Sequence, residues 1–169
     1  IFGQYQRHLS HTQRALSDLL KQARAALGEC ALELRATGSG AINLAKALGI
    51  PFVQEVVAVA QALERCAPQV DVAIELGGED AKIIFFGGAL EERMNGSCAG
   101  GTGAFIDQMA RLLNTDAGGL NALAARHTTL YPIASRCGVF AKTDIQNLMA
   151  RNLPEADIAA SIFHSIAVQ

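Results

Sequence analysis

The chain has 169 residues, of which half are hydrophobic and 18% are charged, so a packed core is expected and disorder is not. Its formal net charge of −2 gives no electrostatic basis for binding nucleic acid or an anionic membrane. No apolar run within the sequence has the length of a signal-peptide core or a transmembrane helix. We therefore expect a cytoplasmic protein made of one domain or two small lobes.

The first part of the chain is predicted to alternate helices with a strand. Apolar residues at helical spacing follow a capping-box pattern at 10–13, and Gly28 fits the end of that helix. The segment 30–36 alternates apolar with polar or small residues, as a half-buried strand does. A glycine-rich turn at 37–40 then opens a helix ending at Gly49, and another helix is predicted over 54–66.

The middle of the chain is predicted to form three strands, and the rest to be helical. The strands are 70–76, 81–86 and 89–94, and the doublets Gly77-Gly78 and Gly87-Gly88 between them indicate hairpins. Helices follow from residue 98 onward, over 120–126 and 139–151, and from 154. The residues expected to be buried in these helices are Phe105, Met109, Leu112, Leu113, Phe140, Ile145, Leu148, Met149, Ile158, Ile162 and Ile166.

This order of elements predicts an α/β chain with a mixed sheet. A soft boundary near Pro68 separates two predicted lobes, 1–68 and 69–169.

Two of the four cysteines share an unusual setting. Cys98 begins a glycine-rich run ahead of a predicted helix, and Cys137 directly precedes another helix. The positive end of a helix favours a thiolate, the form that binds metal. Taken singly, each fits a buried cysteine beside a helix cap better, but together they favour a shared ligand role. Cys30 and Cys66 are expected to be small core residues.

The paired settings lead to a specific hypothesis. An iron–sulfur cluster takes four thiolates, so the two in one chain do not suffice. A symmetric dimer presents the same pair twice at its axis and so supplies four.

Two glycine-rich segments are candidate nucleotide contacts. In the first, Gly77 and Gly78 let backbone N–H groups approach a phosphate, Glu79 and Asp80 are able to hold Mg²⁺ through water, and Lys82 is able to neutralise phosphate charge. Alone, this pattern is also that of an ordinary hairpin turn. The second segment is Gly100, Gly101, Thr102 and Gly103, which precedes a helix and so forms an anion site for either a phosphate or a cluster. The Walker motif and a Ser-His-Asp order are absent from the sequence, and the four histidines show no metal-ligand spacing.

The most specific patterns are Asn95-x-x-Cys98-Ala99-Gly100-Gly101-Thr102-Gly103-x-Phe105 and Cys137-x-Val139-Phe140-Ala141. With them the chain resembles, over almost its whole length, the ATP-dependent activators of 2-hydroxyacyl-CoA dehydratases and the related ATPase subunits of benzoyl-CoA reductase. The resemblance implies an actin/hexokinase/Hsp70-like ATPase fold, in which nucleotide lies between two ribonuclease-H-like lobes.

The resemblance also implies cofactors and partners. It implies a homodimer that holds one [4Fe–4S] cluster between its subunits through Cys98 and Cys137, together with ATP or ADP and Mg²⁺. The partner that receives an electron is a CoA-ester dehydratase or reductase. The turn at 77–80 corresponds to the family's second phosphate loop.

The chain departs from this family in several places. The family usually has Asp where this chain has Glu75, and the stretch after Glu55 is apolar where the family tends to be polar. The Asp-x-Gly-Ser/Thr turn of the first phosphate loop and the glycine-rich adenosine motif do not occur in the 169 residues. We therefore expect an internal fragment, truncated at both ends, that does not hydrolyse ATP alone.

Two other functions stay open at this point. A small-molecule kinase of the sugar or acetate type has the same fold, but it leaves the paired cysteines unexplained. A non-catalytic dimerisation or regulatory domain is mildly supported by Glu75 and by the apolar stretch after Glu55.

Overall fold

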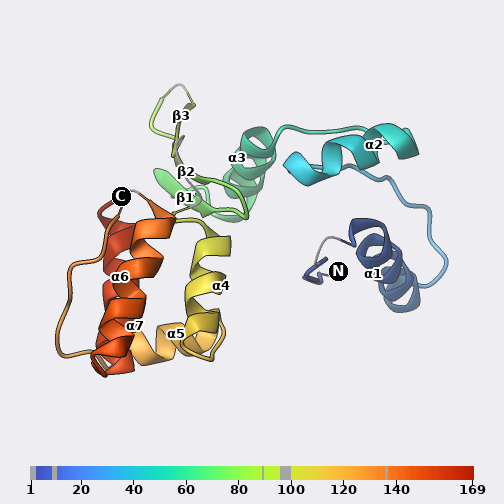
Figure 1. The fold of residues 1–169 in the computed structure, drawn as a ribbon. Helices are drawn as coiled ribbons and strands as arrows, with labels where there is room; N and C mark the ends of the chain where they lie inside the picture. Colours follow the sequence, from blue (N-terminus) through green and yellow to red (C-terminus); the bar gives the residue numbers. More distant parts are fainter. Residues whose placement is uncertain (1–2, 9–10, 89, 96–99, 136) are drawn as a thin grey trace. The chain divides into compact units, whose positions relative to one another are not determined.

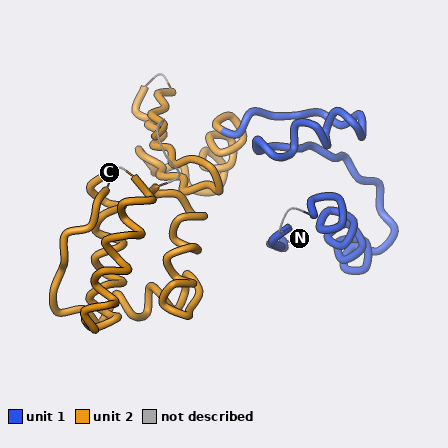
Figure 2. Tube along the Cα trace, in the orientation of Figure 1, with its two compact units in different colours: residues 1–55 blue, residues 56–169 orange. Residues whose placement is uncertain are grey.

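The computed structural model describes residues 3–8, 11–88, 90–95, 100–135 and 137–169. The chain divides into two compact units, 1–55 and 56–169, which Figure 2 shows in different colours. The helices and strands of both units are labelled in Figure 1.

Unit 1 contains α1 (Thr12–Leu27), the short 3₁₀ helix η1 (Ser39–Ala41) and α2 (Ile42–Leu48). Both α-helices end at the glycines that the sequence predicts. The N–H of Gly28 donates to the carbonyl oxygen of Arg24, and Gly49 adopts the left-handed conformation that closes a helix. Ser10 of the predicted capping box lies outside the described residues.

The strand predicted over 30–36 is wrong. Among the described residues of this segment only Ala36 pairs, in an isolated parallel bridge with Phe52. Alternation predicts a strand only where a second strand and a core lie against it, and the apolar Leu32 and Leu34 are exposed here. The segment therefore lacks the burial that would hold it in a sheet.

Unit 2 contains a three-stranded sheet. The elements of this part are α3 (Glu55–Cys66), β1 (Val72–Leu76), β2 (Ala81–Phe85) and β3 (Glu91–Met94), with sheet order β1-β2-β3. Both strand pairs are antiparallel, and the two glycine doublets lie in the connecting turns as predicted. The described sheet is thus not mixed, because connections as short as 77–80 and 86–90 join antiparallel strands, whereas parallel neighbours need a long crossover.

The remainder of unit 2 is helical, as Figure 1 shows. It consists of α4 (Gly103–Leu112), α5 (Ala117–Ala124), α6 (Gly138–Ala150) and α7 (Glu155–Ala167). Helix α7 packs against the other three. These four helices all contribute to one hydrophobic core, whose largest fully buried side chains are Met109, Leu120, Ile145, Ile158 and Ile162. This core fixes the positions of the segments that precede α4 and α6.

One predicted core residue of α6 is wrong. Phe140 is 66% exposed, whereas Ala141, Ile145 and Leu148 are buried. These three lie at i, i+4 and i+7 and so share one face of the helix. Phe140 is one position earlier, a rotation of about 100° away from that face.

The expectation that Cys30 and Cys66 are core residues is also wrong, since both are exposed free thiols. Cys30 lies in the segment that forms no extended strand pairing, and Cys66 is the last residue of α3. No described helix has the length and apolar character needed to span a membrane.

Candidate functional site

The turn between β1 and β2 lies directly against the start of α4. The N–H of Gly103 donates to the carbonyl oxygen of Gly77 at 2.8 Å. A Cβ added to Gly103 would lie 2.7 Å from the carbonyl oxygen of Leu76, closer than real Cβ contacts allow. Glycine at 103 is therefore required by the close approach of two backbones. The two glycine-rich segments that the sequence singled out form one continuous backbone surface.

Charged side chains gather on the strand side of the turn. The buried Lys82 places its Nζ 3.1 Å from Oδ1 of Asp80 and 3.9 Å from Oε2 of Glu75. Glu75 and Lys82 are directly opposite each other in the β1–β2 register. Because opposite charges across a strand pair attract, this pairing fixes the lysine beneath the turn. The carboxylate of Asp80 is thereby held at the turn as well.

The tip of the turn is open. Gly78 and Glu79 are exposed, and a Cβ added to Gly78 would meet no atom within 4 Å. Neither packing nor a left-handed backbone requires glycine at 78. What glycine provides there is free access to the backbone.

The start of α4 is shaped by its cap. Thr102 is completely buried, and its Oγ1 accepts a hydrogen bond from the N–H of Phe105 at 3.1 Å. Gly101 has φ of +81°, a left-handed conformation that favours glycine, and the side chain of Gln169 lies against it. The four predicted residues 100–103 thus form a capped, tightly turned entry to the helix.

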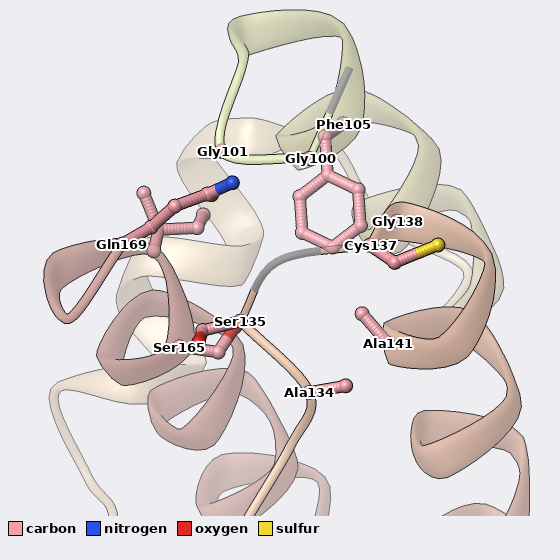
Figure 3. Close-up of a pocket in the computed structure, with 11 residues that line it drawn as sticks. Gly100, Gly101, Phe105, Ala134, Ser135, Cys137, Gly138, Ala141, Ser165 and Gln169 are labelled. Atoms are coloured by element: carbon pink, nitrogen blue, oxygen red, sulfur yellow. The ribbon is translucent and has the colours of Figure 1, made fainter. Parts of the chain in front are cut away.

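The starts of α4 and α6 meet. A Cβ added to Gly100 would lie 3.2 Å from the backbone nitrogen of Gly138, and Figure 3 shows the two glycines side by side. Cys137 is the N-terminal cap residue of α6 and is half-buried. Cys98, two residues before Gly100 in the sequence, lies outside the described residues. The structure therefore brings together the described parts of both cysteine motifs.

A small pocket lies where these helix starts meet the end of α7 (Figure 3). Its lining includes Phe105, Cys137, Ser165 and Gln169. A larger open pocket of about 620 Å³ lies against the sheet, and Lys82 is among its lining residues. Among the described residues, no three His, Cys, Asp or Glu side chains are grouped closely enough to hold a metal ion.

Two features of the site were missed by the sequence reasoning. The side-chain Nδ2 of Asn95 donates to the carbonyl oxygen of Gly100 at 3.2 Å, and its backbone N–H bonds to Ala81. Asn95 thus joins the end of β3 to the segment before α4, and its place in the Asn-x-x-Cys pattern was the available signal. The second feature is an exposed apolar pair, Val139 and Phe140, directly after Cys137.

The comparisons show that the chain has α/β architecture and belongs to the actin/hexokinase-like fold. The chain belongs to the BadF/BadG/BcrA/BcrD ATPase family, whose sequence model matches residues 4–169.

Three relatives show what the chain is similar to. The (R)-2-hydroxyglutaryl-CoA dehydratase activating ATPase of Acidaminococcus fermentans is 32% identical over 156 residues, which are 91% of this chain and 59% of that protein. The activator of lactoyl-CoA dehydratase of Anaerotignum propionicum is 32% identical over 135 residues, 78% of this chain and 51% of that protein. The solved activator of the 2-hydroxyisocaproyl-CoA dehydratase from Clostridium difficile with bound ADPNP has a TM-score of 0.80 at 28% identity, covering 91% of this chain and 59% of that one. The chain thus spans about half to three fifths of the length of these proteins.

Proposed function

We propose that this chain carries the cluster-binding part of an ATP-dependent activator that delivers electrons to a CoA-ester dehydratase or reductase. One observation carries the proposal: the starts of α4 and α6, which directly follow the two cysteine motifs, pack against each other and against the Gly77 turn. The names of the similar proteins, activators of CoA-ester dehydratases, support the same activity.

The nucleotide contacts are proposed at the turn and at the start of α4. Gly78 and Glu79 present an exposed backbone to phosphate, while the N–H of Gly77 bonds to the carbonyl oxygen of Asp80 and so shapes the turn. The ion pair with Lys82 holds Asp80 in place for Mg²⁺ bound through water. Residues 100–103 lie at the N-terminus of α4, whose positive end is a second anion contact, while the N–H of Gly103 itself bonds to the carbonyl oxygen of Gly77. The ADPNP bound in the solved relative supports ATP or ADP as the nucleotide.

The cluster ligands are proposed to be Cys98 and Cys137. A [4Fe–4S] cluster takes four thiolates, so the two proposed in one chain form a half-site that a second copy completes. The half-buried position of Cys137 at the N-terminus of α6 suits a thiolate ligand shared with another subunit. The exposed Val139 and Phe140 beside it give that subunit an apolar surface to contact. Such a cluster supplies one-electron chemistry at low potential when it is bound.

Three finer points complete the proposal. We assign 1–68 and 69–169 to two ribonuclease-H-like lobes from the break between α3 and the sheet, whereas the compact units of the structure divide earlier, after Glu55. We place the protein in the cytoplasm, where thiols stay reduced. The 169 residues alone are expected not to turn over ATP, because the Asp-x-Gly-Ser/Thr turn of the family is not among them.

Anaerobic reconstitution with iron and sulfide tests the proposal. We expect a brown dimer with about four irons per two chains, since four thiolates serve one cubane cluster. Cys98→Ser and Cys137→Ser should each abolish the colour. Cys30→Ser and Cys66→Ser are the matched controls, because these thiols are exposed and lie outside the site. Colour retained in both of the first two variants would remove the ligand assignment.

A further inference from the structure

The connection from α5 to α6, residues 125–137, contains no helix or strand among its described residues. Connections this long are uncommon in compact domains and are usually functional or disordered. Its central part, residues 128–134, is here called the strap. The strap is held to the helices by polar side chains, and it leads to Cys137.

The first anchor of the strap is a buried carboxylate on α7. Asp157 is only 3% exposed, and its Oδ1 accepts hydrogen bonds from the backbone N–H of Thr128 at 2.7 Å and of Thr129 at 3.1 Å. The hydroxyl of Thr128 donates to the same oxygen at 3.3 Å. A buried carboxylate is costly unless it is bonded in this way, so the helix and the strap depend on each other here.

The second anchor lies one helical turn further along α7. Ser161 is completely buried, and its Oγ accepts a hydrogen bond from the N–H of Tyr131 at 2.8 Å. Its hydroxyl in turn donates to the carbonyl oxygen of Asp157 at 2.6 Å. Residues four apart lie on the same face of a helix, so both α7 anchors face the strap.

The third anchor is on α6 itself. Oδ2 of Asp144 accepts a hydrogen bond from the N–H of Ala134 at 2.9 Å. Ala134 is three residues before Cys137, and Asp144 is on the helix that Cys137 caps. The bond therefore ties the chain entering the cysteine to the helix leaving it.

We propose that Asp144, Asp157 and Ser161 are positioning residues for Cys137: by fixing the strap, they hold the cysteine in its half-buried place at the start of α6. This rests on the proposed function only for the use of that thiol as a cluster ligand. The packing of the strap residues Tyr131 and Ile133 against the core holds the same segment from its apolar side.

The test measures the alkylation rate of each cysteine by iodoacetamide in the full 169-residue chain without metal. Trypsin places the four cysteines on separate peptides, because basic residues lie between them, so mass spectrometry follows each one separately. In Asp144→Ala, we expect alkylation of Cys137 to become about tenfold faster, since a hydrogen bond to a carboxylate no longer opposes local opening. Cys30 and Cys66 are internal references whose rates should not change.

Two further variants separate positioning from a general loss of stability. Asp144→Asn keeps a side-chain oxygen that accepts from Ala134, so it should restore the slow rate. Asp116→Ala is the matched control, because Asp116 also accepts one backbone N–H, from Gly119, at the start of α5. It should lower stability without changing the rate at Cys137.

An unchanged rate at Cys137 in Asp144→Ala, or equal acceleration in Asp116→Ala, would overturn the proposal. Ser161→Ala should accelerate the reaction in the same way as Asp144→Ala. Because the readout needs no cluster, a protein that fails to bind iron but shows these rates would contradict the proposed function alone.

Discussion

The close contact between the β1–β2 turn and α4 gives a sharp prediction for Gly103→Ala. The new Cβ would lie 2.7 Å from the carbonyl oxygen of Leu76 and 3.3 Å from that of Gly77, both of them backbone atoms with little freedom to move. Overpacking of this kind costs about 1–3 kcal/mol. Separation of the two backbones also weakens the 2.8 Å hydrogen bond from Gly103 to Gly77, which contributes about 0.5–1.5 kcal/mol.

The helix preference of alanine over glycine offsets about 1 kcal/mol of this cost. We therefore expect the unfolding free energy to fall by about 2 kcal/mol. Urea unfolding should show a lower midpoint with an unchanged slope. Gly118→Ala is the matched control, because Gly118 lies in the first turn of α5 and its new Cβ would make only an ordinary contact, 3.4 Å from Asp116. A Gly103→Ala protein as stable as the parent would refute the packing of the turn on α4.

Three further predictions concern the turn, a buried acid and α6. Gly78→Ala should weaken nucleotide binding, measured by calorimetry, without loss of stability. Gly88→Ala, in an equally open turn, is the control and should change neither affinity nor stability. Equal nucleotide affinities of the two variants would exclude the β1–β2 turn as a phosphate contact. Hydrogen bonds from the N–H groups of Thr128 and Thr129 lower the pKa of Asp157 below its ordinary value of 3.8. The stability that the ionised Asp157 contributes is therefore present above pH 3.8 and is lost as the pH falls further. The urea midpoint of Asp157→Asn should not show this loss at acid pH. Ile145→Ala should lower the unfolding free energy of the monomer by about 2–5 kcal/mol, because Ile145 is buried. Phe140→Ala, on the exposed face of α6, should lower it by less than about 0.5 kcal/mol. Similar losses in the two variants would contradict the assigned buried face of α6.

The parts of the fold that were predicted from the sequence follow local rules. Gly28 and Gly49 end helices because both have positive φ, which glycine adopts readily. Gly77-Gly78 was predicted as a turn because a glycine doublet lies between two apolar runs. The strand over 30–36 failed because pairing depends on a distant partner, which the alternating pattern does not reveal. Phe140 failed because the buried face of α6 is set by packing against α7 rather than by hydrophobicity alone.

In the candidate site, too, features set by local sequence could be predicted, and features that depend on distant partners could not. The sequence correctly placed Gly100 to Gly103 and Cys137 just before or at the starts of helices, because glycine and capping patterns are local. The anchors of the strap were not found, because Asp157 bonds to Thr128, 29 residues earlier, and Ser161 bonds to a residue 30 positions away. A lone Asp or Ser in a helical pattern gives no sign of such a distant backbone partner.

The contacts that join the turn to the cysteine segment consist of backbone atoms. Gly77 bonds to Gly103 at the start of α4, and Gly100, just before that helix, lies against Gly138 at the start of α6. A side chain in such a path would absorb a small displacement by changing its rotamer, but backbone atoms in contact are able to respond only by moving together. A ligand that shifted the turn would therefore shift the ends of two helices. Glycine permits this close approach at 77, 100 and 103, where an added Cβ would lie 3.2 Å or less from a neighbouring atom, whereas at 138 it would make only an ordinary contact.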